Sequence, residues 1–216
     1  MLMNKIGFLF DLDGVLIDSE KEYTRIWTTI GQLFPTQYED FAIRIKGMTL
    51  TNILNTYYED NITREAVRKQ LYAMESEMRY EWLPGAKELL QELCDRGIPK
   101  ALVTSSNQDK MAYLYRQIPE LKNFFEAIIT GDKVPRSKPD PVGYEIGAME
   151  IGCRPHKCAV FEDSLQGVMA GERAGAMVIG VIGTLKEEVI APHCNLCVST
   201  LIDFPLERII HYIATR

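Results

Sequence analysis

Five short apolar runs, rich in β-branched residues, recur along the chain and are separated by longer amphipathic segments. The runs lie at residues 6–10, 100–103, 127–130, 158–161 and 177–181. Such continuously apolar runs are typical of parallel strands that are buried on both faces. The segments between them carry helix start and stop signals, at residues 84–97, 108–117, 141–152 and 165–175. Alternating strands and helices predict an α/β fold with a doubly wound, mostly parallel sheet.

One interval is too long for this alternation. Residues 15–80 span about 66 positions, whereas a whole βαβ unit takes about 30. The interval has a helical pattern: residues 19–33 carry a row of apolar side chains, and we expect a second helix from Thr63, as N-cap, to Tyr80. The alternative is that these helices only pad one face of the sheet. We favour a small inserted α-helical cap domain, residues 15–81, on an α/β catalytic core of residues 1–14 and 82–216.

Polar side chains follow four of the predicted strands where each strand ends. Each one alone has an ordinary explanation as a helix cap or turn residue. In open parallel sheets, however, ligands bind outside the carboxyl ends of the strands, so these side chains are expected to share one crevice. The set consists of Asp11 and Asp13, then Thr104, Ser105, Ser106 and Asn107, then Asp132 and Lys138, and finally Glu162 and Asp163.

These residue types suit phosphoryl transfer to a carboxylate. We predict that Asp11 is the nucleophile, because a carboxylate that attacks phosphorus divides hydrolysis into two easier displacements. Asp13 is placed to protonate the leaving oxygen and then to deprotonate the attacking water. Lys138 and Thr104 would stabilise charge on the transferring group. The predicted phosphate-binding set also includes the loop that follows the second strand, Ser105, Ser106 and Asn107.

Several carboxylates beside a dianionic phosphate would repel it without a divalent cation. Oxygen ligands favour Mg²⁺, and Glu162 and Asp163 are expected to hold that ion together with Asp11. The sequence therefore predicts a magnesium cofactor.

The composition and net charge of the chain limit the classes of partner that it can bind. The chain has 216 residues, 46% of them hydrophobic, with a net charge of -6. An acidic chain of this kind argues against general binding of nucleic acid or a membrane surface, both of which are polyanionic. Its five cysteines are an odd number and suit a reducing compartment. We interpret Cys194 and Cys197 as ordinary half-buried thiols rather than as a zinc-binding or redox-active pair. We expect a cytoplasmic protein, a monomer or weak dimer, that acts on a small phosphorylated substrate.

Four motifs in order resemble the haloacid dehalogenase superfamily, in its phosphatase branch with a helical cap. They are residues 10–15 (FDLDGV), 103–106 (VTSS), 137–141 (SKPDP) and 161–164 (FEDS). The resemblance implies that Asp11 is the nucleophile, that Asp13 is the acid/base, and that the backbone oxygen of Asp13 joins the metal ligands. Asp13 argues against a dehalogenase, because the branch with that activity lacks the second aspartate.

Within the superfamily the chain is most similar to phosphoglycolate phosphatase-like and β-phosphoglucomutase-like enzymes. Residues 46–49 (KGMT) resemble the loop by which such caps touch substrate, and Lys46 is a candidate for binding a second anionic group; the alternative is a solvated lysine beside a turn. The mutase branch places a histidine at the position of Tyr23 and a phosphate-binding arginine at that of Leu50. We therefore expect a phosphatase, with a sugar phosphomutase as the alternative and a non-catalytic phospho-accepting regulatory module as a third hypothesis.

Overall fold

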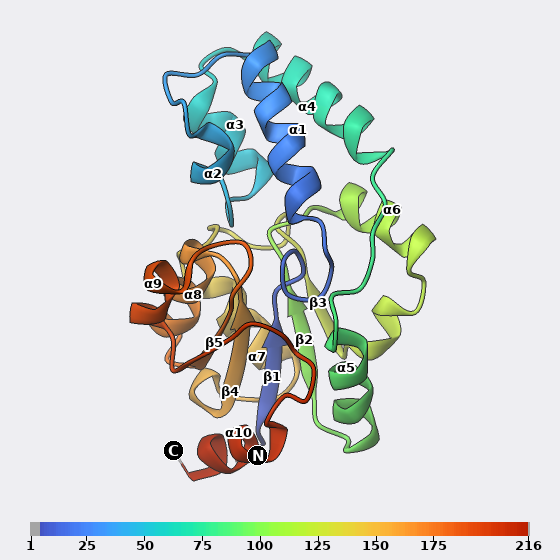
Figure 1. The fold of residues 1–216 in the computed structure, drawn as a ribbon, viewed down its shortest axis with the longest axis vertical. Helices are drawn as coiled ribbons and strands as arrows, with labels where there is room; N and C mark the ends of the chain where they lie inside the picture. Colours follow the sequence, from blue (N-terminus) through green and yellow to red (C-terminus); the bar gives the residue numbers. More distant parts are fainter. Residues whose placement is uncertain (1–4, 216) are drawn as a thin grey trace.

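A six-stranded parallel sheet forms the centre of the computed structural model, which describes residues 5–215 (Figure 1). The strand order is β3-β2-β1-β4-β5-β6, and central Leu9 pairs with Ala101 on one side and Val160 on the other. The predicted doubly wound α/β fold is confirmed. The strands are β1 Gly7–Phe10, β2 Lys100–Val103, β3 Ala127–Ile129, β4 Cys158–Glu162, β5 Met177–Val181 and β6 Leu196–Val198.

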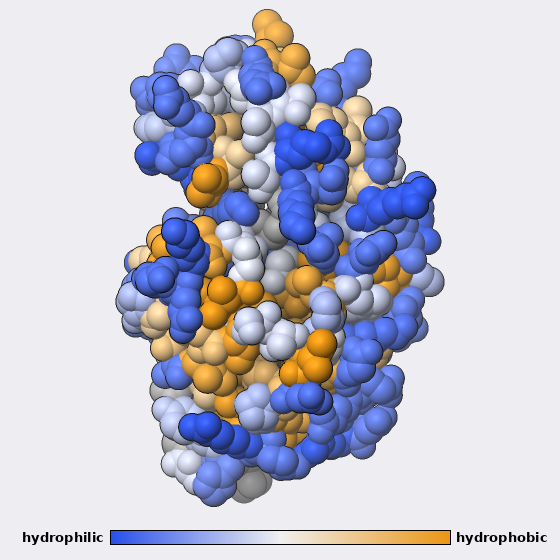
Figure 2. All heavy atoms as spheres, in the orientation of Figure 1, coloured by the Kyte–Doolittle hydropathy of each residue, from blue (hydrophilic) through white to orange (hydrophobic). Residues whose placement is uncertain are grey.

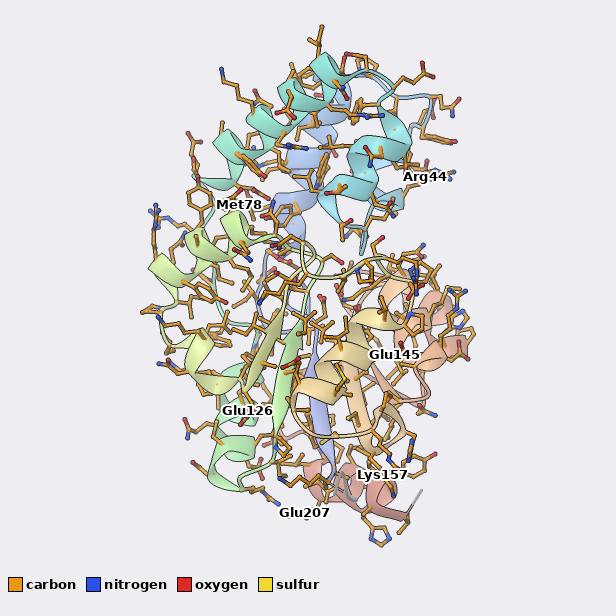
Figure 3. The ribbon with its side chains drawn as sticks, turned by 180° about the vertical axis from the view of Figure 1, so that it is seen from behind. Arg44, Met78, Glu126, Glu145, Lys157 and Glu207 are labelled. Atoms are coloured by element: carbon orange, nitrogen blue, oxygen red, sulfur yellow. The ribbon has the colours of Figure 1, made fainter. Side chains whose placement is uncertain are left out.

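Helices cover the two faces of the sheet, because alternate residues of each strand point in opposite directions. Leu9 and Val160 belong to an apolar cluster that includes residues of α7 (Val142–Glu150) and α8 (Leu165–Arg173). Figure 3 shows α7, with Glu145 labelled, lying across the sheet from behind. Phe8 and Phe161 face a second cluster, to which three other helices contribute: α5 (Ala86–Asp95), α6 (Gln108–Gln117) and α10 (Leu206–Thr215).

Four helices from the long insertion lie together beyond the carboxyl ends of the strands, at the top of Figure 1. Ile26, Trp27 and Leu71 are among the buried side chains that hold them together. Two connecting segments join these helices to the sheet. The segments contact each other through a hydrogen bond from Asp18 N to Glu81 O (2.9 Å). The helices are α1 Glu20–Leu33, α2 Phe41–Arg44, α3 Leu50–Tyr57 and α4 Asn61–Glu75.

The insertion is also where the predicted elements differ most from the structure. Asp60, not Thr63, caps α4: its carboxylate accepts a hydrogen bond from the Thr63 backbone N–H at 2.8 Å. The helix ends at Glu75 rather than at Tyr80. The helices α2 and α3 were not expected, because neither is long enough to show a clear period in the sequence.

Short elements complete the chain and include the region of the paired cysteines. They are α9 Glu187–Ile190 and the 3₁₀ helices Leu121–Phe124, Pro155–Lys157 and Ala191–His193. Cys194 lies two residues before β6 and Cys197 lies within it, and both are half-buried free thiols. Burial raises the pKa of Cys194 to about 12. In residues 5–215 no helix has the length and apolar character needed to cross a membrane.

Candidate active site

The polar residues that follow β1, β2 and β4 meet at one edge of the sheet, beneath the inserted helices. The sheet changes its winding direction between β1 and β4, and crevices at such a point are the usual ligand sites of doubly wound folds. A cavity of about 120 Å³ opens there, and Figure 2 shows the molecule hollowed between α1–α4 and the sheet-bearing part. Its walls include most of the predicted site residues: Asp11, Asp13, Lys46, Thr104, Ser105, Ser106, Asn107 and Asp163.

Asp11 lies at the floor of this cavity in a buried ion pair. Lys138 Nζ donates to Asp11 Oδ1 at 2.5 Å and also to Glu162 Oε1. Burial raises the pKa of Asp11 to about 7, although the Lys138 ammonium opposes the rise. Burial lowers the pKa of Lys138, but Asp11 and Glu162 outweigh it and raise that pKa above its ordinary value. One lysine from the β3 side therefore positions a carboxylate from each of the two central strands.

Glu162 is fully buried and accepts five hydrogen bonds. Lys138 Nζ and Tyr144 Oη (2.8 Å) donate to its Oε1. The backbone N–H groups of Asp163 and Ser164 and the Ser164 hydroxyl donate to its Oε2. The carboxylate packs so closely on Gly167 that a Cβ at that position would overlap it. Glu162 thus orients Lys138 and fixes the turn between β4 and α8.

Asp163 faces the cavity from the same turn. Its carboxylate accepts a hydrogen bond from the Thr184 hydroxyl and comes close to Gly14, which has a φ of 73°. A side chain at Gly14 would overlap Asp163, so glycine meets both the backbone and the space requirement there.

Carboxylate oxygens of Asp11, Glu162 and Asp163 lie within 4.8 Å of one another. This buried set of oxygen donors fits a hard cation such as Mg²⁺. Because Glu162 already accepts five hydrogen bonds, an ion would have to compete with those donors at this residue.

Asp13 is held by a second lysine, which the sequence analysis missed. Lys110 Nζ, on α6, donates to Asp13 Oδ2 at 2.5 Å, and the Ser106 hydroxyl donates to the same oxygen at 3.0 Å. The Ser19 hydroxyl donates to Oδ1. Burial raises the pKa of Asp13, but Lys110 and these hydroxyls outweigh it, so the pKa lies below its ordinary value. The carboxylate form, which can accept a proton, is favoured in this arrangement.

The loop after β2 provides hydroxyl and amide groups along the cavity. Thr104 is buried, and its Oγ1 accepts a hydrogen bond from the Ser106 backbone N–H at 3.0 Å. The Ser105 hydroxyl donates to Gly47 O of the inserted region at 2.8 Å. Asn107 caps α6 through Lys110 N (2.9 Å) and donates to Tyr72 Oη (3.0 Å). The loop therefore contacts both Asp13 and the inserted helices.

Three of the residues expected at this edge do not line the main cavity: Asp132, Lys138 and Glu162, of which Glu162 is fully buried. Asp132 is exposed and is absent from the cavity wall. Lys138 lines a smaller adjacent cavity and reaches the site through its ion pairs.

The inserted helices form the opposite wall. Trp27, Leu50 and Leu71 make much of this wall apolar. Tyr23 stacks beneath Lys110, whose Nζ lies 4.0 Å from the ring centroid, and its hydroxyl donates to Glu75 Oε1 at 2.8 Å. The lysine that holds Asp13 is thus linked to the inserted helices through Tyr23.

The helical period of the sequence contains a signal for both Lys110 and Glu75. Glu75 lies four and eight residues after the buried Leu71 and Val67 of α4, and Lys110 lies four residues before the buried Leu114 of α6. Residues four apart share a face of a helix, so both charges lie on buried faces. A charged residue on a buried helix face is a candidate for a functional role.

Comparison with known proteins identifies the family of the chain. The family model described as haloacid dehalogenase-like hydrolase matches residues 7–175, which is more than half of the chain. The chain therefore belongs to this hydrolase family and is an enzyme, as the four motifs predicted.

Two curated relatives are phosphatases by name. Hexitol phosphatase A of Escherichia coli is 36% identical over 180 residues, covering 81% of this chain and 82% of the relative. The phosphorylated carbohydrates phosphatase of Thermotoga maritima is 31% identical over 187 residues, covering 83% of this chain and 86% of the relative. Among solved structures, a β-phosphoglucomutase from Clostridium difficile has a TM-score of 0.78 at 21% identity. The match covers 98% of this chain and 97% of the mutase chain. At that identity the likeness concerns the fold.

Proposed function

We propose that this enzyme is a magnesium-dependent phosphatase that hydrolyses a small phosphorylated metabolite of the sugar phosphate class through an aspartyl-phosphate intermediate. One observation carries the proposal: Asp11, paired with Lys138, and Asp13, paired with Lys110, face the same cavity from one strand end. The phosphatase names of the relatives support the reaction type, and two of those names support a carbohydrate-related substrate.

In the first step, an Asp11 carboxylate oxygen attacks phosphorus, and the bond from phosphorus to the substrate oxygen breaks. For this step Asp13 acts in its protonated form, which the second step regenerates although its neighbours favour the carboxylate, and it gives that proton to the leaving oxygen, which departs as an alcohol. In the second step, Asp13 takes a proton from water as the water oxygen attacks phosphorus. Asp11 is released as a carboxylate, and the phosphate departs. Lys138 and the Thr104 hydroxyl with the amides of its loop offset the charge on the transferring group.

The proposed ion would be held by carboxylate oxygens of Asp11 and Asp163, with Glu162 in the same cluster. The family resemblance adds the backbone oxygen of Asp13. When bound, Mg²⁺ neutralises charge on the phosphate and on the surrounding carboxylates.

We further propose that residues 15–81 act as a cap domain over this site. Two hydrogen bonds between cap and core support that role: from Ser105 Oγ to Gly47 O (2.8 Å), and from Asn52 Nδ2 to Ser137 Oγ (2.7 Å). A cap that contacts the phosphate-binding loop can exclude water while the first displacement takes place. Lys46 lines the cavity next to Gly47 and is proposed to bind substrate. We propose a cytoplasmic monomer or weak dimer with no nucleic-acid or membrane partner.

The mutase alternative is less well supported by the cap wall. Tyr23 is engaged with Lys110 and Glu75, and Leu50 gives the wall an apolar side chain where the mutase branch has an arginine. A regulatory module that only accepts phosphate would need neither a paired acid/base nor an enclosing cap.

The test is phosphate release, with and without Mg²⁺, from sugar phosphates, polyol phosphates, phosphoglycolate, nucleotides and an aryl phosphate. β-Glucose 1-phosphate is followed for isomerisation in the same series. We expect Mg²⁺-dependent release from one or a few of these compounds. Glucose 6-phosphate formed without loss of phosphate would replace this proposal with a mutase. Release that is unaffected by chelation of divalent ions would overturn the metal assignment.

A further inference from the structure

Glu75, the last residue of α4, is a cap carboxylate that the proposed reaction does not use. It is 4% exposed and lines the same cavity as Asp11 and Asp13. The only other charged cap residue in this wall, within the described part of the chain, is Lys46.

The two oxygens of Glu75 have different surroundings. Oε1 accepts a hydrogen bond from Tyr23 Oη at 2.8 Å. Oε2 is buried and has no hydrogen-bond partner among the residues that the structure describes. A buried carboxylate oxygen without a donor is costly, and such groups normally have a partner. Because Glu75 lines the cavity, its unsatisfied oxygen points to a donor that arrives with a ligand.

The charges around Glu75 indicate what that donor is. Lys110 is the nearby cation, and its Nζ is already engaged with Asp13 Oδ2 at 2.5 Å and with the Tyr23 ring. A second negative group on the substrate would therefore meet the Glu75 carboxylate without a free cation from this lysine. A neutral hydroxyl supplies the missing O–H donor and adds no charge.

We infer that Glu75 is a specificity-determining residue that accepts a hydrogen bond from a substrate hydroxyl through Oε2. The site would then select monophosphates of polyhydroxylated compounds, such as polyols and sugars, over phosphates that place a second anionic group beside Glu75. The inference rests on the proposed phosphatase function and refines its substrate class.

The test compares two substrates that differ at one carbon. Sorbitol 6-phosphate ends in a hydroxymethyl group, and 6-phosphogluconate ends in a carboxylate. The selectivity is the kcat/KM for the first divided by that for the second, measured for the unaltered enzyme and for Glu75→Gln. The substitution keeps the shape of the side chain but removes its charge and one acceptor. Glu77→Gln is the matched control, because Glu77 is exposed just beyond the end of the same helix.

The unaltered enzyme should prefer sorbitol 6-phosphate by at least about tenfold. Glu75→Gln should lower the selectivity by about tenfold to a hundredfold, the equivalent of one hydrogen bond to a charged group. Glu77→Gln should retain it. Because the readout is a ratio, a general loss of active protein does not change it.

Three results would overturn the inference. They are a preference of the unaltered enzyme for 6-phosphogluconate, an unchanged ratio in Glu75→Gln, and release of phosphate only from compounds without a polyhydroxylated chain. If instead no compound of the wider panel releases phosphate, the phosphatase proposal itself fails, which distinguishes the two conclusions.

Discussion

Replacing Lys110 by methionine isolates the charge that holds Asp13. The substitution keeps a long unbranched side chain but removes an ammonium 2.5 Å from Asp13 Oδ2 in a partly buried pair. Tyr23 and Glu75 are the other close groups. An opposite charge at this range lowers a carboxyl pKa by about 1–3 units. One unit corresponds to about 1.4 kcal/mol, so the variant should lose about 1.4–4 kcal/mol of unfolding free energy at pH 7.

The pH dependence of this loss has a defined sign. The pKa of Asp13 in the folded enzyme lies below its ordinary value, so the pair stabilises the fold fully above the unfolded pKa of about 4. That contribution is lost as the pH falls through the lower, folded pKa. In Lys110→Met the ammonium no longer opposes the effect of burial, so the pKa of Asp13 in the folded protein is higher than in the unaltered enzyme. The Asp13 carboxylate of the variant therefore takes up its proton at a higher pH. The stability difference between the two proteins should therefore narrow as the pH is lowered from 7 toward 4.

Urea unfolding at several pH values measures both quantities. Lys69→Met, at an exposed position of α4, is the control and should change stability by no more than about 0.5 kcal/mol. In an Asp13→Asn background the effect of Lys110→Met should shrink, because the paired charge is already absent. An equal loss in both backgrounds, or a loss that does not depend on pH, would refute the reasoning.

Three further substitutions test other parts of the site. Asp13→Asn removes the proposed acid/base and should lower kcat by about 10²–10⁴-fold in a folded protein, whereas an unchanged rate would defeat that role. Gly167→Ala brings a Cβ into the Glu162 carboxylate and should cost about 1–3 kcal/mol in thermal or urea unfolding. Gly183→Ala, which has open space, should cost much less, and equal costs would contradict the packing argument. Tyr144→Phe removes a 2.8 Å hydrogen bond to a buried carboxylate and should destabilise by about 1.5–3 kcal/mol, so an unchanged melting temperature would argue against that bond.

The fold and the floor of the site could be predicted because their signals are local. Buried parallel strands give continuous apolar runs, and β2 and β5 have the predicted bounds. The residues that follow β1, β2 and β4 meet at one edge of the sheet because all six strands are parallel. Asp11, Thr104 and Asp163 were found in this way.

The partners of Lys110 and Glu75 could not be predicted in the same way, because they depend on how separate helices pack. Nothing near Lys110 in the sequence shows that its ammonium reaches Asp13, 97 residues away. The hydrogen bond from Tyr23 to Glu75 also joins two helices that are far apart in the chain. The helical period marks both charges as lying on buried faces, but only the packed structure identifies their partners.

Chemical trapping at Asp11 tests the central proposal most directly. The enzyme is mixed with its best substrate and Mg²⁺, quenched during turnover and treated with borohydride, which reduces an aspartyl phosphate to homoserine. Mass spectrometry of the peptide that contains residues 7–14 then reads position 11. We expect homoserine at position 11 only when substrate is present, and none in Asp11→Asn. Homoserine at another aspartate, or undiminished turnover by Asp11→Asn, would contradict the assignment of Asp11 as the nucleophile.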